Sequence, residues 1–425
     1  MESLALMPRY EAYKDSGVEW LGDIPSSWEL KPGFVAFSES KSNNKGMKEN
    51  TVLSLSYGHI VVKPEEKLVG LVPESFETYQ LVEPDDIIVR CTDLQNDKVS
   101  LRTGLAKNKG IITNAYLNLR VKNGFDARFL HYYLHALDTT KVLYKFGSGL
   151  RQNLSFLDFK RLPIFEILED TQKLIANYLE KKTAQVDEAI AIKEQQISLL
   201  KERKQIIIQQ AVTQGLDPNV PMKDSGVDWI GKIPAHWNLM SLRYAFEFLN
   251  SRRVPISAVE RESRQGVYPY YGASGVIDYV DDYIFDEDLI LIAEDGANLL
   301  SKSTPLAFVA TGKYWVNNHA HIIKPKFHGF KYWAELLSGL DYTVFISGAA
   351  QPKLTRDRLA SVLVPVPPKD EIQEIISFIE GIEPDLNRTI DIQKSQIEKL
   401  KEYKTTLINS AVTGKIKITP EMVEQ

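Results

Sequence analysis

The sequence contains the same unit twice, and this duplication constrains the fold more than any other feature. Residues 14–28 read KDSGVEWLGDIPSSW and residues 223–237 read KDSGVDWIGKIPAHW, with ten of fifteen positions identical. These two segments are called the KDSG motifs. Residues 197–213 match residues 397–413 at nine of seventeen positions, and a weaker match relates residues 152–155 to 351–355. Because the three matches occur in the same order, we predict a tandem duplication of a unit of about 200 residues.

The matches divide the chain into parts that agree between the copies and parts that differ. A chain of 425 residues is too long for one hydrophobic core, so several domains are expected. The predicted parts are an N-terminal segment (1–30), a first variable domain (31–165), a helical spacer (166–213), a linker with the second KDSG motif and second variable domain (214–368), a second helical spacer (369–413) and a tail (414–425). This contrast indicates a shared scaffold that carries two different domains.

Each helical spacer carries a heptad stripe. Its apolar positions are Val186, Ile190, Ile197, Leu200 and Ile207 in the first copy and Leu386, Ile390, Ile397, Leu400 and Leu407 in the second. A 3.5-residue period favours helices packed along a coiled-coil seam. The first helix is predicted over residues 171–212, and the second is predicted to break at Gly381 and restart with Pro384 in its first turn. Antiparallel pairing within the chain is the preferred arrangement, and a coiled coil with another molecule is the alternative.

The variable domains read as α+β. Strands are predicted over residues 51–57, 86–90 and 111–121, with a helix over 127–137, in the first domain. In the second domain, strands are predicted over 289–293, 306–310 and 319–325, with a helix over 331–337. The predicted fold class is therefore a tandem duplication of two α+β domains, joined by two long antiparallel helices that form an intramolecular coiled coil.

Motifs for catalysis are missing from the sequence. Gly312-Lys313 is followed by Tyr314 and lacks the upstream glycine of a phosphate loop. Neither Gly-x-Gly-x-x-Gly after a strand nor His-Glu-x-x-His occurs. Glu294 and Asp295 are adjacent on a strand end and should point apart, which favours hydrogen bonding in a turn over acid–base catalysis. These observations predict a binding protein and not an enzyme.

Four histidines could form pairs. His131 and His135 lie one helical turn apart, but their aromatic and apolar neighbours favour a packed helix over a metal site. His319 and His321 are predicted on one face of a strand, as part of a polar or recognition surface. We therefore expect neither a metal nor a cofactor bound by this chain.

The cysteine content and the lengths of the apolar runs indicate in which cellular compartment the protein is found. The single cysteine, Cys91, rules out an intramolecular disulfide and is typical of a reducing environment. No apolar run approaches the roughly 18 residues of a spanning helix, and the N-terminus does not read as a signal peptide. A cytoplasmic protein is expected.

Several motifs together carry a resemblance. They are the two KDSG motifs, Tyr-Tyr-Gly-Ala-Ser-Gly at 270–275, Glu-Asp-Gly-Ala at 294–297, Trp-Val-Asn-Asn-His-Ala-His at 315–321, and the elements that begin at Gln152 and Gln351. In this order, the sequence resembles the specificity subunit of type I restriction–modification systems over essentially the whole chain. The first domain departs most, because it has Pro84 before Asp85 where that family usually has glycine before aspartate.

The resemblance implies a division of labour. Members of that family hold two target-recognition domains at opposite ends of an antiparallel helical pair, and each domain reads half of a bipartite DNA target. The helical pair sets the spacer between the half-sites. The implied partners are double-stranded DNA, two methyltransferase subunits and two motor-nuclease subunits in the prokaryotic cytoplasm, without membrane contact. S-adenosylmethionine, ATP and Mg²⁺ are expected on those partners and not on this chain.

Candidate DNA contacts follow from the chemistry of base edges. Arg and Lys suit guanine, Asn and Gln suit adenine, and small or apolar groups suit the thymine methyl. The candidates in the first domain are His59, Arg90, Gln95, Asn96, Arg102, Asn114, Arg151 and Gln152. Those in the second are Tyr271, Ser274, Asn298, Lys302, Asn317, Asn318, His319, Gln351 and Lys353. Phosphate contacts are expected from Lys41, Lys45, Lys48, Lys107 and Lys109, which would position without specifying. Glu194, Lys201 and Lys401 are candidates for subunit docking, with a solvated charged face as the alternative.

The charge is uneven along the chain. The net charge is −5, yet residues 31–165 carry 19 basic and 14 acidic residues (+5), whereas residues 240–366 carry 13 and 14 (−1). Neither domain is strongly basic, so DNA binding by the chain alone should be weak and salt-sensitive. The alternatives are a coiled-coil scaffold with two protein-binding domains and an enzyme with an unusual site.

Overall fold

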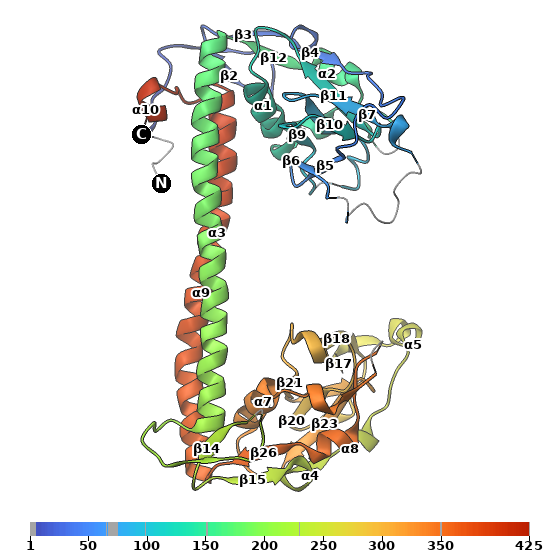
Figure 1. The fold of residues 1–425 in the computed structure, drawn as a ribbon, viewed down its shortest axis with the longest axis vertical. Coiled ribbons are helices and arrows are strands. Elements are labelled where there is room, and N and C mark those ends of the chain that lie inside the picture. The colour runs from blue at the N-terminus through green and yellow to red at the C-terminus, as the bar shows by residue number, and fades with distance from the viewer. Residues whose placement is uncertain are drawn as a thin grey trace. The chain divides into compact units, whose positions relative to one another are not determined.

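A computed structural model describes residues 6–64, 66, 75–97, 99–149, 152–228, 230–348 and 351–424. The chain forms two compact units: unit 1 comprises Met1–Lys193 and Ser395–Gln425, and unit 2 comprises Glu194–Lys394. Two long helices cross the boundary, because α3 (Glu169–Gln214) and α9 (Lys369–Val412) each begin in one unit and end in the other (Figure 1).

Unit 1 is built around a four-stranded antiparallel sheet of order β4 (Phe37–Glu39), β11 (Tyr116–Val121), β8 (Ile87–Arg90) and β9 (Thr103–Leu105). Helix α1 (Ala127–Thr139) buries Phe129, Leu130 and Leu134 in the same core as Ile87 and Val89. The remaining elements are β1 (Tyr13–Asp15) paired with β2 (Asp23–Pro25), β3 (Glu29–Pro32) with β12 (Pro163–Glu166), β5 (Leu53–Ser56) with β6 (His59–Val62), β7 (Gln80–Val82) with β10 (Gly110–Ile112), and helices α2 (Phe156–Arg161) and α10 (Pro420–Glu424).

Unit 2 repeats this plan. Its sheet has the order β16 (Phe246–Phe248), β23 (Ala320–Pro325), β20 (Leu289–Ala293) and β21 (Ala307–Ala310), and α7 (Phe330–Gly339) packs on it. The pairs β13 (Met222–Asp224) with β14 (Lys232–Pro234) and β15 (Asn238–Ser241) with β26 (Leu363–Val366) match β1–β2 and β3–β12, and α8 (Arg356–Ser361) matches α2. The duplication read from the sequence is therefore a duplication of the fold.

Unit 2 also has a second sheet, of order β18 (Gly275–Val280), β17 (Gln265–Gly272), β22 (Lys313–Val316) and β19 (Phe285–Asp286). Its antiparallel pairs correspond to β5–β6 and β7–β10 of unit 1, where a parallel bridge between Val52 and Ile111 takes the place of the parallel pairing of β17 with β22. The other elements are the pair β24 (Ile346–Ser347) with β25 (Lys353–Leu354) and the short helices α4 (Leu242–Ala245), α5 (Ala258–Ser263) and α6 (Asn298–Ser301). Single 3-10 turns across the two units span Gly33–Val35, Phe76–Thr78, Val142–Lys145, Asn250–Arg252 and Thr343–Phe345.

Helices α3 and α9 pair antiparallel, and the two copies make the same contacts. In unit 1, Lys404 Nζ lies 2.7 Å from Asp187 Oδ1. In unit 2, Lys204 Nζ lies 3.1 Å from Asn387 Oδ1, which is the equivalent pair 200 residues away. The heptad positions Val186, Ile390, Ile397, Leu400 and Leu407 are buried, and Ile190, Ile197, Leu200, Ile207 and Leu386 are half-buried. The pairing is thus intramolecular, and the alternative of an intermolecular coiled coil is not needed to cover the seam.

The predicted break in the second helix is wrong. Helix α9 continues through Gly381 and Pro384. Tertiary contacts hold both sides of the proline: Ile379 is fully buried, and Glu383 pairs with Lys204 at 3.0 Å and with Lys331 at 2.9 Å. These contacts offset the hydrogen bond that a proline removes from a helix interior.

Replacing this proline should stabilise the protein. Pro384 is exposed, and restoring the missing N–H in Pro384→Ala is expected to raise the free energy of unfolding by about 1–3 kcal/mol. Denaturant unfolding of the full chain measures this change. Gly381→Ala is the matched comparison, with a gain of at most about 1 kcal/mol, since an added Cβ there meets nothing within 4 Å. A loss of stability in Pro384→Ala would mean that the packing of α9 depends on the distortion at the proline.

Two other expectations about strands need correction. The single strand predicted over residues 111–121 is divided between β10 and β11 by a turn at 113–115, where Asn114 donates to the carbonyl of Thr78. The strand predicted over 319–325 begins at Ala320, so His319 precedes it. As a result the two histidines do not share a face: His321 is fully buried, whereas the side chain of His319 is half-exposed.

Candidate nucleic-acid interface

The loop after the central strand lies beside the glutamine element in both units. In unit 1, the amide of Leu154 donates to the carbonyl of Cys91 at 2.8 Å. In unit 2, the amide of Leu354 donates to the carbonyl of Glu294 at the same distance. Because Leu154 and Leu354 are equivalent positions in the duplication, each domain has its own surface at this place, and the two surfaces share the same main-chain geometry. The residues on it differ between the domains.

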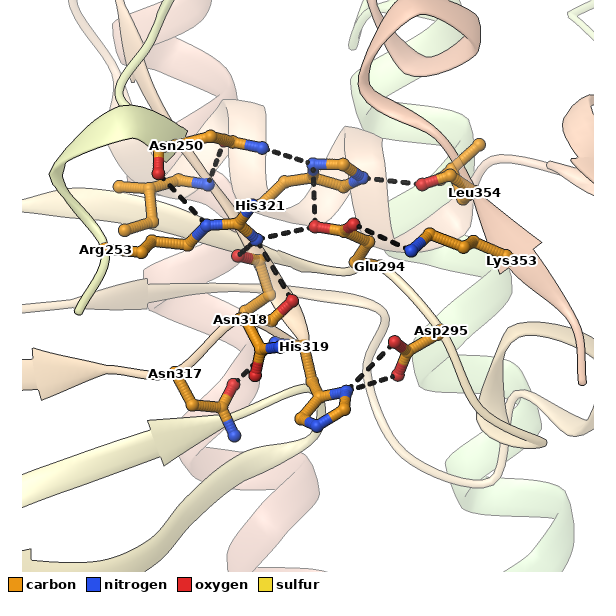
Figure 2. A network of polar contacts seen from close by, with 12 residues as sticks. Asn250, Arg253, Glu294, Asp295, Asn317, Asn318, His319, His321, Lys353 and Leu354 are labelled. Carbon is orange, nitrogen blue, oxygen red and sulfur yellow. Dashed lines mark hydrogen bonds and ion pairs between the residues drawn. The ribbon is translucent and has the colours of Figure 1, made fainter. Parts of the chain in front are cut away.

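In unit 2, Arg253 lies at the centre of this surface (Figure 2). Its Nη1 donates to Glu294 Oε2 at 2.5 Å and to the carbonyls of Asn318 at 3.2 Å and Ala320 at 2.9 Å. Glu294 also pairs with Lys353 at 3.4 Å. Burial raises the pKa of Glu294, but the hydrogen bond from Arg253 and the nearby positive charges outweigh it and hold that pKa below its usual range. Glu294 therefore remains a structural anion beneath the surface.

His321 supports the same surface from below. One ring nitrogen lies 2.7 Å from the carbonyl of Leu354, and the other lies 2.8 Å from the Asn250 amide nitrogen. The carbonyl partner requires a proton on Nε2, so the ring accepts through Nδ1. Burial lowers the pKa of His321, which keeps the ring neutral in this arrangement.

The exposed residues of the surface come from the segment that links β22 to β23. The His319 ring lies 2.9 Å from both carboxylate oxygens of Asp295, and Asn318 is exposed beside it (Figure 2). Asn317 is buried and accepts the amide of His319 at 2.8 Å. Glu294 and Asp295 thus point to different partners, as the sequence indicated. The structure brings Asn317, Asn318, His319 and Lys353 together, with Tyr271 accepting the amide of Asn317.

In unit 1, Arg102 is not a base-reading residue. Its side chain is fully buried beneath the loop after β8, and its nitrogens donate to Tyr144 and to main-chain carbonyls of that loop. A guanidinium whose donors are all directed inward cannot reach a base edge. The prediction that Arg102 reads DNA is wrong, because sequence position alone does not reveal on which side of a strand end an arginine folds.

The loop above Arg102 carries polar side chains on the outside. Arg90 pairs with Asp97 at 3.0 Å, and the Asn96 amide donates to Asp93 at 2.7 Å. The amide of Asp93 donates in turn to the side chain of Asn153, at 2.9 Å. Gln95, Asn96 and Gln152 are exposed. Arg90, Gln95, Asn96 and Gln152 therefore share this surface.

The other candidates lie elsewhere in their units. His59 and Lys107 line a cavity that residues of α1, α3 and α9 also line. The side-chain amide of Asn298 forms hydrogen bonds with both the N–H and the carbonyl of Thr304. Lys302 lies 3.7 Å from Asp341, and Ser274 is exposed in the β17–β18 turn. Of the predicted phosphate contacts, Lys41 pairs with Glu39, Lys109 pairs with Glu83, and Lys45 and Lys48 are exposed. Gln351 is exposed before β25, and Arg151 lies outside the described residues.

Other predicted features are also placed. His131 and His135 are half-buried and line the same cavity as His59, and burial lowers their pKa values to about 3 and about 4. Among the described residues, no group of His, Cys, Asp or Glu has a geometry that could hold a metal. Glu194, Lys201 and Lys401 are exposed on the helices. In the part of the chain that is described, no helix has the length and apolarity to cross a membrane.

Sequence reasoning missed Arg253 and recognised Glu294 only as a hydrogen-bonding residue. The one local signal for Arg253 is its place in the Asn-Ser-Arg-Arg run at 250–253, which is also typical of an ordinary exposed turn. The partners of Arg253 Nη1 lie 41 to 67 residues away along the chain, so only the folded structure identifies its role.

Comparisons with known proteins agree with this architecture. Residues 234–402 match the family model of the type I restriction modification DNA specificity domain. A type I restriction enzyme specificity subunit of Haemophilus influenzae is 32% identical over 136 residues, which cover 32% of this chain and only about a third (34%) of that protein. The type I restriction enzyme MjaX specificity subunit of Methanocaldococcus jannaschii is 23% identical and aligns over 94% of this chain and 96% of that protein.

The fold is similar to a solved structure as well. A chain from a structure of type I restriction–modification complex assembly and conformational transition superposes with a TM-score of 0.66 at 13% identity, covering 92% of this chain and 98% of that one. This likeness concerns the fold. In sequence, residues 234–402 match the type I restriction modification DNA specificity domain, and the chain is similar along most of its length to a type I restriction enzyme specificity subunit.

Proposed function

We propose that this chain reads a bipartite, asymmetric DNA sequence, with one half-site for each variable domain. One observation carries the proposal: the two units share a scaffold, yet the surface at its equivalent position presents Arg90, Gln95 and Asn96 in one unit and Asn318, His319 and Lys353 in the other. Amide, imidazole and cationic groups are those that distinguish base edges in the major groove. Unlike surfaces on like scaffolds would read unlike half-sites.

The chemistry would belong to partner subunits. Two methyltransferase subunits would supply adenine methylation with S-adenosylmethionine, and two motor-nuclease subunits would use ATP and Mg²⁺. The polar clusters described above support a non-catalytic role, because Glu294, Asp295 and His321 are each engaged with a structural partner. Exposed helix positions such as Glu194, Lys201 and Lys401 are available for docking these subunits.

The helical pair would set the spacer between the half-sites. Helices α3 and α9 are continuous from one unit to the other, which supports this role. The low charge of the domains also bears on binding. The net charge is +5 over residues 31–165 and −1 over residues 240–366, so few phosphate contacts can come from this chain. We therefore expect the chain to bind DNA tightly only together with a partner subunit, in the prokaryotic cytoplasm.

Selection from a randomised double-stranded DNA library tests the proposal. The chain with its methyltransferase partner should enrich a split sequence with two unlike halves, whereas the chain alone should bind weakly and lose binding steeply as salt rises. The partner alone is the control. An absence of enrichment by the complex would favour a protein-binding scaffold, and methylation or cleavage by the chain alone would make it an enzyme.

A further inference from the structure

Each variable domain contains one arginine, fully buried in unit 1 and half-buried in unit 2, whose guanidinium donates to main-chain carbonyls of the loop that carries the exposed polar side chains. These residues are Arg102 in unit 1 and Arg253 in unit 2. They come from different strand connections, so the duplication does not account for both. Their shared placement points to a shared task.

Arg253 fixes the main chain on both sides of His319. Its Nη1 reaches the carbonyls of Asn318 and Ala320, and its Nε reaches the carbonyl of Asn250 at 3.1 Å. From the other side, the amide of Glu294 donates to the carbonyl of His319 at 2.9 Å. The segment is therefore held at three consecutive carbonyls while the side chains of Asn318 and His319 remain exposed.

Arg102 holds the loop of unit 1 in the same way. Its Nη1 donates to the carbonyls of Thr92 at 2.8 Å and Arg90 at 3.3 Å. Its Nη2 donates to the main-chain carbonyls of Asp93, at 3.2 Å, and of Asp97. Its Nε donates to the Tyr144 hydroxyl at 3.1 Å. The loop wraps around the guanidinium, and Gln95 and Asn96 are exposed on its outer side.

Only arginine can make this arrangement. Its planar fork presents five N–H donors at fixed angles, whereas a lysine ammonium is a compact group with three donors. A buried cation is costly unless its donors are satisfied, so the main chain around it adopts one geometry. Hydrogen bonds to base edges need such geometry, because a reading side chain on a displaced loop no longer matches its base.

We infer that Arg102 and Arg253 are positioning residues, one for each half-site, which set the direction of the reading side chains without touching DNA. This inference rests on the proposed function. It assigns the selectivity of the first half-site to the Arg102 loop and that of the second to the Arg253 loop.

Arginine-to-lysine variants test the inference, because they keep the charge and remove the fork. In library selection with the methyltransferase partner, Arg102→Lys should reduce base discrimination at one half-site about tenfold or more, and Arg253→Lys should do so only at the other. Each variant thus controls for the other. Arg120→Lys and Arg252→Lys are matched controls, since these arginines pair with Asp86 and Glu287 and hold no reading loop; they should leave both half-sites unchanged.

Milder variants and a second readout cover the case in which a lysine variant does not fold. Tyr144→Phe removes the acceptor of Arg102 Nε, and Glu294→Gln weakens the pairing of Arg253. Each variant should reduce base discrimination at the half-site assigned to its arginine, but by less than the corresponding lysine variant. Hydrogen–deuterium exchange needs no DNA. Amides of residues 91–97 should exchange faster in Arg102→Lys and those of 317–320 faster in Arg253→Lys.

The outcomes separate the two proposals. If the unmodified complex enriches no sequence, the proposed function fails, and exchange still decides whether the arginines hold the loops. If it enriches a split sequence and the lysine variants keep both preferences, the positioning role is overturned. Equal weakening at both half-sites with unchanged base preference would also overturn it, because that is the result of a purely structural role.

Discussion

Replacing residues 31–165 with the corresponding domain of another specificity subunit should change one half of the target and leave the other half unchanged. The structure offers matched junctions, because β3 and β12 pair with each other and Lys31 lies opposite Ile164. Both cuts therefore fall on one two-stranded ribbon, outside the four-stranded sheet and the reading loop. Library selection on the chimaera with its methyltransferase partner measures the outcome.

The second domain supplies the reciprocal control. Strands β15 and β26 pair with Met240 opposite Val364, so residues 240–364 can be exchanged at equivalent junctions. This chimaera should alter only the half-site that the first one preserves. The expected change is complete replacement of the preferred bases, since each good bidentate contact discriminates by about 1–3 kcal/mol and several contribute. A change in both half-sites from one exchange would contradict modular reading.

The scaffold was predictable from the sequence because its signals are local and occur twice. The heptad stripe predicted α3 to within two residues at each end, and the apolar run at 289–293 predicted β20, which is buried along its whole length. Antiparallel pairing followed from a folded domain between the two helices. The break at Pro384 did not occur, since the ion pairs of Glu383 come from residues far away in the sequence.

The reading surface was only partly predictable. Residue type predicted the amides of Asn317 and Asn318 and the imidazole of His319, and the structure places them on one segment, with Asn317 buried and the other two exposed. Arg102 was also predicted from its residue type, but its side chain folds inward, and the local sequence does not indicate the carbonyls that surround it. The β17–β18 hairpin was not predicted, because its tyrosine-rich motif was interpreted as part of the DNA-recognition surface and not as a strand. Long-range packing decides all of these cases.

Lengthening both helices by one heptad should lengthen the spacer of the DNA target. Seven residues add about 10 Å to a helix, which corresponds to about three base pairs. The insertions belong between Lys193 and Glu194 in α3 and between Lys394 and Ser395 in α9, where the two units meet along the chain. Every described contact within each unit is then kept, including Lys404 with Asp187 and Lys204 with Asn387. Seven residues also preserve the phase of the seam.

The spacer is measured by selecting from libraries in which the two half-sites are separated by different lengths. The preferred length should rise by about three base pairs while both half-site sequences stay the same. Affinity should fall as well, because three base pairs turn the second half-site by about 100° around a DNA helix of roughly 10.5 base pairs per turn. Insertion into α3 alone is the control, and it should abolish selection by breaking the register with α9. An unchanged spacer in the double insertion would show that α3 and α9 do not set the distance between the half-sites.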